Sequence, residues 1–190
     1  MIIVGVGIGP GMMTQEAEEA IGRARLIYGS KRSIDLAREY IDPDCIVREI
    51  EDYKRLSSLP EEAVVLSTGD PMLSGLGYLP GRVIPGISSL QVACARLKIS
   101  ELDVVPITVH GRRMDPEAIA SELSRNKSVF LLTDDSTDLE GVCRLLEERG
   151  LARSVLALTD LGYPQERIER GSTASPPQAP GLSCVLIGPL

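Results

Sequence analysis

Short apolar segments alternate with amphipathic segments through the first hundred residues of this chain, and this alternation limits the folds it can adopt. The apolar segments have strand length, and the segments between them place apolar residues at helical spacing, such as Ile34, Ala37 and Ile41. Thr14 stands where a helix N-cap is expected, ahead of acidic residues. The predicted strands are 2–6, 25–29, 45–50, 63–67 and 82–86, and the predicted helices are 14–24, 31–41 and 88–99. Strands alternating with helices predict an α/β fold with a mainly parallel sheet.

The order of the predicted elements changes after about residue 107. Strands begin to follow one another, with few residues between them for helices. The segment 172–181 is rich in Pro and Ser and is predicted to be a loop. Gly150 is the expected C-cap of the second helix of this part. The predicted helices are 115–124 and 138–150, and the predicted strands are 128–135, 154–161, 166–172 and 183–190. We therefore predict two small α/β domains, 1–107 with a mainly parallel sheet and 108–190 with a mixed sheet.

Composition excludes several classes of function. The net charge of −7 argues against nonspecific binding of nucleic acid, which needs a dense basic surface. The four cysteines form no CxxC pair, and a single histidine leaves too few ligands for a zinc site, so we expect no metal site and reduced, buried thiols. No apolar run approaches 18 residues and the N-terminus does not resemble a signal peptide, so we expect no membrane span and a cytoplasmic protein.

The segment "GVGIGPG", residues 5–11, follows the first predicted strand and contains four glycines. A dinucleotide-binding fingerprint, GxGxxG, would need glycine at position 10 or 12, which are Pro10 and Met12. Pro10 also removes a backbone N–H from the place where a phosphate would be bound. Two interpretations remain: a tight strand-to-helix turn, or backbone that must come close to a ligand or to another loop.

Two further loops favour the second interpretation. "STGDP", residues 67–71, and "IPGISS", residues 84–89, each follow a predicted strand. In a parallel sheet all three loops leave the same carboxyl edge, where α/β proteins bind ligands. We therefore predict a ligand site at this edge.

The segments "GIGPG", "STGDPMLSGLG" and "PGISSLQVACARL", in this order and spacing, resemble the tetrapyrrole methylase family over nearly the whole chain. The later "TVHGR" and "LGYPQERI" resemble its precorrin-6Y methylase branch. One departure is visible, because only two residues separate Gly11 from Thr14 where the family has a longer stretch.

The resemblance implies a methyltransferase that uses S-adenosyl-L-methionine, yields S-adenosyl-L-homocysteine, and methylates ring carbon 5 of cobalt-precorrin-7 in cobalamin biosynthesis. It also implies a homodimer and association with a separate carbon-15 methyltransferase/decarboxylase. Methylation of another tetrapyrrole position and cofactor binding without turnover are the alternatives. A nucleotide-binding oxidoreductase is disfavoured by the glycine spacing.

The resemblance also implies which residues form the site, with the cofactor held between the two domains. Asp70 has a second interpretation, as a turn residue that bonds its own backbone, and Ser88 or Ser89 a second one as a helix N-cap. No catalytic side chain is assigned. The implied cofactor-binding residues are Ile8, Gly9, Pro10, Gly69, Asp70, Pro71, Met72, Leu73, Ser88, Ser89 and Leu132.

Three polar residues in "TVHGRR" are implied to bind the substrate. His110, Arg112 and Arg113 lie near the expected domain junction. Arginine binds carboxylates in a bidentate manner, and the implied substrate carries several carboxylates. The alternatives are a structural histidine and a solvated charged face. Asp134 and Asp135 are expected to begin a turn before a helix rather than to act on metal or protons.

Overall fold

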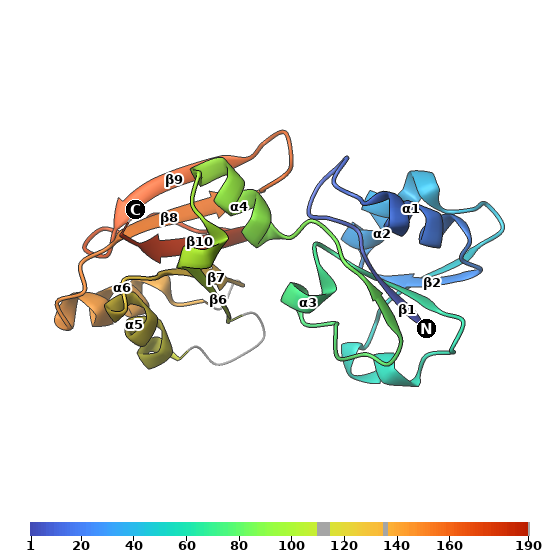
Figure 1. Ribbon diagram of the computed structural model, residues 1–190, viewed down its shortest axis with the longest axis horizontal. Coiled ribbons are helices and arrows are strands. Elements are labelled where there is room, and N and C mark those ends of the chain that lie inside the picture. Colours follow the sequence, from blue (N-terminus) through green and yellow to red (C-terminus); the bar gives the residue numbers. More distant parts are fainter. Residues whose placement is uncertain (110–114, 135–136, 190) are drawn as a thin grey trace. The chain divides into compact units, whose positions relative to one another are not determined.

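The computed structural model describes residues 1–109, 115–134 and 137–189, and the chain divides into two compact units, Met1–Ser89 and Leu90–Leu190. Each unit contains one five-stranded sheet with its own helices (Figure 1). The strands are β1 Ile2–Gly5, β2 Leu26–Gly29, β3 Ile46–Glu49, β4 Val64–Ser67, β5 Arg82–Ile84, β6 Val104–Thr108, β7 Ser128–Leu132, β8 Ser154–Thr159, β9 Arg167–Ser172 and β10 Ser183–Gly188. The α-helices are α1 Gln15–Gly22, α2 Lys31–Ala37, α3 Pro71–Ser74, α4 Ser89–Leu97, α5 Pro116–Ser124 and α6 Leu139–Glu148, and the 3₁₀ turns are η1 Arg38–Tyr40, η2 Tyr53–Ser58 and η3 Glu101–Asp103.

The sheet of the first unit is parallel throughout, as predicted. Its strand order is β3-β2-β4-β1-β5, and β1 pairs with β4 on one side and β5 on the other. Successive side chains of a strand face opposite sides of the sheet. Val4 therefore packs with Ala17 and Ile21 of α1, whereas Ile3 packs with Leu56 and Leu79 on the other side.

The first two helices begin where the sequence predicts them, and the second ends earlier. Thr14 caps α1 by accepting the N–H of Ala17 at 3.2 Å. The α-helix α2 ends at Ala37 and its last turn tightens into η1, whereas helix is predicted through Ile41. Pro43 disfavours helical backbone at Asp42, so no helix is expected beyond Ile41.

The second sheet is mixed, also as predicted. Its order is β6-β7-β10-β8-β9, with β6 and β7 parallel and the other pairs antiparallel. Helices α5 and α6 lie beside it, and their apolar residues, such as Leu123 and Leu146, pack with Val129 and Val185. Gly150, with φ of +69°, follows the end of α6 and donates its N–H to the carbonyl of Glu147 at 2.9 Å.

Strand β6 is absent from the sequence prediction, which treats this segment as the region of a domain boundary. Pro106 in its centre argues against a strand, but β6 is an edge strand, where proline is tolerated. Because β6 pairs with β7, it belongs to the second unit. The two compact units meet between Ser89 and Leu90, earlier in the chain than the predicted boundary. The domains 1–107 and 108–190 stay a prediction.

The cysteines are free, as expected, but only two are fully buried. Cys94 and Cys143 are buried, whereas Cys45 and Cys184 are partly exposed. Burial raises the pKa of the Cys143 thiol to about 11, with Glu147 and Glu140 adding to the effect. Within the described ranges, no group of residues has the composition of a metal site and no helix is long and apolar enough to cross a membrane.

Candidate functional site

Three loops of the first unit leave adjacent strands at one edge of the parallel sheet. The first loop, residues 6–14, follows β1; the GDP loop, residues 68–73, follows β4; and the third loop, residues 85–88, follows β5. Because β4, β1 and β5 are neighbours and run parallel, the loops meet at the carboxyl edge. The predicted grouping of these loops is confirmed.

Two glycines join the first loop to the GDP loop through their backbones. The N–H of Gly69 donates to the carbonyl of Gly7 at 2.8 Å, and the N–H of Gly7 donates to the carbonyl of Gly69 at 3.3 Å. Both residues have positive φ, +73° for Gly7 and +72° for Gly69. Glycine adopts this conformation without the steric cost of a side chain.

Two further glycines allow the third loop to approach the others. A Cβ atom on Gly5 would lie 2.5 Å from the nitrogen of Gly86 and 2.7 Å from the carbonyl oxygen of Gly69. A Cβ atom on Gly86 would lie 2.3 Å from the same oxygen. The glycines of "GVGIGPG" therefore allow the backbones of three loops to pack closely against one another.

The carboxylate of Asp70 is bound by backbone N–H groups of two loops. Its Oδ1 atom accepts hydrogen bonds from the N–H of Met72 at 2.8 Å and of Leu73 at 3.2 Å, which caps α3. Its Oδ2 atom accepts the N–H of Gly86 at 3.1 Å. The predicted turn role of Asp70 is confirmed, and the carboxylate also links the GDP loop to the third loop.

Two other predicted residues of this unit, Ile8 and Ser88, lie next to Gly69. Ile8 is buried, and a Cβ atom on Gly69 would lie 3.1 Å from its Cγ2 atom and 3.9 Å from the Cα atom of Ser88. Ser88 is buried and directly precedes α4, which begins at Ser89. Met72 is 69% exposed at the start of α3.

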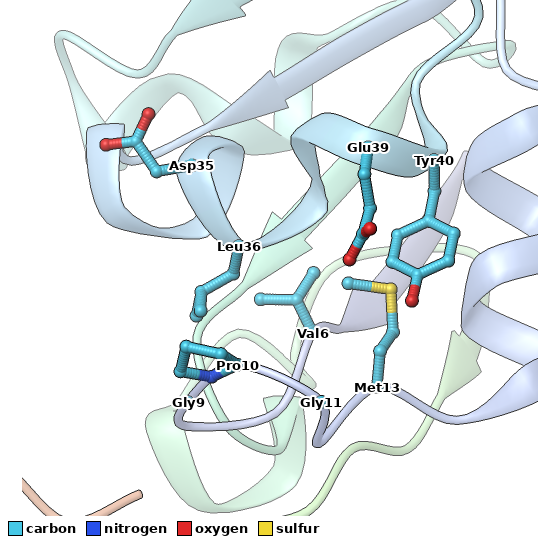
Figure 2. A pocket seen from close by; sticks show the side chains of 9 residues that line it. All are labelled: Val6, Gly9, Pro10, Gly11, Met13, Asp35, Leu36, Glu39 and Tyr40. Atoms are coloured by element: carbon cyan, nitrogen blue, oxygen red, sulfur yellow. The ribbon is translucent and has the colours of Figure 1, made fainter. Parts of the chain in front are cut away.

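A cavity of about 130 Å³ lies on the α2 side of the first loop (Figure 2). In Figure 2 the Leu36 side chain points toward Pro10, and Met13 extends toward Glu39 and Tyr40. Ligand pockets that enclose a drug-sized molecule measure about 300–1,000 Å³. This cavity is smaller than such pockets. The lining residues are Val6, Gly9, Pro10, Gly11, Met13, Asp35, Leu36, Glu39 and Tyr40.

One hydrogen bond holds the first loop to α2, and no pattern in the sequence predicts it. The Nη2 atom of Arg32 donates to the carbonyl oxygen of Ile8 at 2.6 Å. The two residues are 24 positions apart, and no local pattern predicts such a contact. The strand order brings them together, because only β4 separates β1 from β2 in the sheet.

The remaining predicted site residues fall in the second unit or outside the described ranges. Leu132 ends β7 in the second unit. The carbonyl of Asp134 accepts the N–H of Thr137 at 3.0 Å, and the rest of the turn expected here lies outside the described residues. The predicted residues outside the described ranges are His110, Arg112, Arg113 and Asp135.

Two curated relatives share most of this chain. A probable cobalt-precorrin-7 C(5)-methyltransferase from Methanocaldococcus jannaschii is 30% identical over 185 residues, which cover 86% of this chain and 85% of the relative. A decarboxylating precorrin-6Y C(5,15)-methyltransferase from Sinorhizobium sp is 27% identical over 184 residues. That match covers 88% of this chain but only 44% of the longer relative.

Two solved structures share the fold over nearly the whole chain. The crystal structure of the cobalamin-biosynthesis precorrin-6Y methylase from Archaeoglobus fulgidus is 30% identical with a TM-score of 0.78, covering 99% of this chain and 97% of that chain. A uroporphyrin-III C-methyltransferase from Thermus thermophilus, complexed with S-adenosylhomocysteine, is 18% identical with a TM-score of 0.76, covering 98% and 91%.

A family model places the chain more directly. The model of the tetrapyrrole (corrin/porphyrin) methylases matches residues 1–177, which include all three loops of the first unit and most of the second unit. The precorrin-6Y methylase structure, at 30% identity, points to the branch indicated by the later motifs of the sequence. The chain therefore belongs to the tetrapyrrole methylase family and is a methyltransferase.

Proposed function

We propose that this protein transfers the methyl group of S-adenosyl-L-methionine to ring carbon 5 of cobalt-precorrin-7. The observation that carries the proposal is the similarity to the M. jannaschii relative, which extends over 85% of that protein's length. The motifs at the loops and the A. fulgidus structure support the same branch.

The chemistry agrees with a site built from backbone and small residues. Methyl transfer is an in-line displacement in which the ring carbon attacks the methyl group and the sulfonium leaves as a neutral thioether. The methylated ring then releases one proton, which balances the charge. Holding the two reactants in line supplies much of the rate, and excluding water strengthens the remaining electrostatic interactions. A triad or metal cluster is unnecessary for this reaction, and we assign no catalytic side chain.

We propose that the cofactor binds to the backbone of the three loops, close to Gly9, Gly69 and Ser88. The support is the close packing of these loops, which leaves glycine and proline backbone at the carboxyl edge of the sheet. We also propose Leu132 as a cofactor-binding residue, as the family resemblance implies. We propose that His110, Arg112 and Arg113 bind the substrate, the two arginines through its carboxylates.

The state of assembly is part of the proposal. We expect a homodimer, because a small protein of two thin units gains stability by covering apolar surface, and sedimentation at micromolar concentration tests this. The longer Sinorhizobium relative, of which this chain matches 44%, carries carbon-15 chemistry in its name. We propose that this protein associates with a carbon-15 methyltransferase/decarboxylase.

The test is a transfer assay with purified protein, S-adenosyl-L-methionine and a series of precorrins. We expect one methyl group to be added to cobalt-precorrin-7, with no release of carbon dioxide. Methylation of a different intermediate would move the activity to another ring position. Cofactor binding without transfer to any precorrin would support a binding protein instead.

A further inference from the structure

The guanidinium group of Arg32 fixes one peptide group of the first loop. Arg32 lies on α2, and its Nη2 atom is 2.6 Å from the carbonyl oxygen of Ile8 in a partly buried contact. A short hydrogen bond from a charged donor is stronger than one between neutral groups. The orientation of the peptide between Ile8 and Gly9 is therefore set by a residue outside the three loops.

This orientation determines where the next N–H group points. The C=O and N–H of a trans peptide point in opposite directions, so the N–H of Gly9 points away from the Arg32 guanidinium. Gly9 is buried, and within the described parts of the chain its N–H has no hydrogen-bond acceptor. Buried backbone N–H groups are nearly always paired, and an unpaired one beside a candidate ligand site indicates a donor that a ligand completes.

We propose that Arg32 is a positioning residue that holds the N–H of Gly9 toward the cofactor, and that this N–H binds the carboxylate of the methionyl end. This inference rests on the proposed function. The carboxylate is the anionic group of S-adenosyl-L-methionine, and a fixed, otherwise unpaired N–H donor favours an anion. The sulfonium is a cation and would avoid the same place.

Two acidic residues, Asp35 and Glu39, line the cavity on the α2 side of this loop. Asp35 pairs with Arg38 at 2.5 Å, and Figure 2 shows its side chain directed away from Pro10. The Ile8 carbonyl accepts its hydrogen bond from Arg32 of α2, and the N–H of Gly9 points away from that carbonyl.

The test compares two ligands that differ in the amino-acid end. S-adenosylhomocysteine carries the carboxylate, and 5′-methylthioadenosine lacks it. In calorimetry we expect Arg32→Met to bind S-adenosylhomocysteine at least about tenfold more weakly, as for the loss of one hydrogen bond to a charged group. The affinity of this variant for 5′-methylthioadenosine should stay within about twofold of the wild-type value, because this ligand has no carboxylate to lose a hydrogen bond.

Arg23→Met is the matched control, since Arg23 is an exposed arginine that pairs only loosely with Glu19 at 3.5 Å. It should bind both ligands like wild type. If Arg32→Met binds S-adenosylhomocysteine like wild type, or loses affinity for both ligands equally, the inference is wrong. If wild-type protein binds neither ligand, the proposed function fails instead.

A measurement on the wild-type protein keeps the inference testable if Arg32→Met does not fold. In ¹H–¹⁵N spectra the amide proton of Gly9 should shift downfield when S-adenosylhomocysteine binds. 5′-Methylthioadenosine should leave this signal nearly unchanged. Equal shifts with both ligands, or none with either when both are bound, would overturn the assignment of Gly9 to the carboxylate.

Discussion

The Oδ2 atom of Asp70 accepts the backbone N–H of Gly86 at 3.1 Å, so one carboxylate joins the loop after β4 to the loop after β5. The same side chain caps α3 through Met72 and Leu73. Asp70 thus acts on the site through backbone geometry. This role requires no direct contact between its side chain and a ligand.

Replacing Asp70 by alanine should weaken both folding and cofactor binding. Loss of a helix cap costs about 1 kcal/mol of unfolding free energy, and release of the third loop should lower affinity for S-adenosylhomocysteine about tenfold, or 1.4 kcal/mol. Asp115 provides a matched control, because it also precedes a proline and caps α5 through Glu117 and Ala118. Asp115→Ala should lose similar stability and keep its cofactor affinity; equal affinities in the two variants would contradict the linking role.

Replacing Gly69 by valine should weaken cofactor binding more than it weakens the stability of the fold. The residue has φ of +72°, which a branched side chain avoids, and its new Cβ atom would lie 3.1 Å from Ile8. We expect at least a tenfold loss of S-adenosylmethionine affinity, about 1.4 kcal/mol, in calorimetry on protein shown by circular dichroism to be folded.

Gly150→Val is the control for this change, since Gly150 has φ of +69° with nothing within 4 Å of its Cβ position. It introduces the same backbone strain in the second unit. It should bind the cofactor like wild type. A folded Gly69→Val protein with wild-type affinity would show that the cofactor does not bind at the GDP loop.

Arg113→Ala should separate substrate binding from cofactor binding. The guanidinium would bind carboxylates of the macrocycle and has no favourable interaction with a sulfonium. We expect S-adenosylmethionine affinity to stay near wild type while the KM for the precorrin rises. A parallel loss of cofactor affinity would count against the assignment of Arg113 to the substrate.

The ion pair between Glu166 and Arg96 should make stability depend on pH. Partial burial raises the pKa of Glu166, but the N–H of Gly162 at 2.9 Å and the guanidinium of Arg96 at 2.7 Å outweigh it, so the pKa is lowered from its ordinary value of 4.5. A carboxyl with a lowered folded-state pKa stabilises the protein above its unfolded-state pKa, and this contribution is lost as pH falls through the folded-state value.

The unfolding midpoint of wild-type protein should therefore fall faster than that of Glu166→Gln as pH drops below 4.5. Calorimetry over a pH series measures both. Glu62→Gln, an exposed carboxylate, should follow wild type. Parallel curves for wild type and Glu166→Gln would show that this pair does not contribute.

The sequence predicts the first unit well because its signals are local. Strand-length apolar runs, the Thr14 cap and the loops after β1, β4 and β5 can each be read within a few residues. It does not predict β6, because Pro106 is acceptable only on a strand whose outer edge is free. That condition depends on the order of strands in the sheet.

The candidate site likewise combines local features that the sequence predicts with contacts that depend on the order of the strands. The glycine-rich segments predict close backbone approach, but Gly5 and Gly86 contact each other only because β1 and β5 are neighbours. The bond between Asp70 and Gly86 and the bond between Arg32 and Ile8 join distant segments. Spacing along the chain carries no information about such pairs.

The most direct test of the central claim is to locate the transferred methyl carbon. Purified protein is incubated with cobalt-precorrin-7 and S-adenosylmethionine labelled with ¹³C in its methyl group, and the product is analysed by NMR after its mass is measured. We predict a single labelled methyl group on ring carbon 5. A label on another carbon, or none under conditions where the cofactor is shown to bind, would contradict the proposed function.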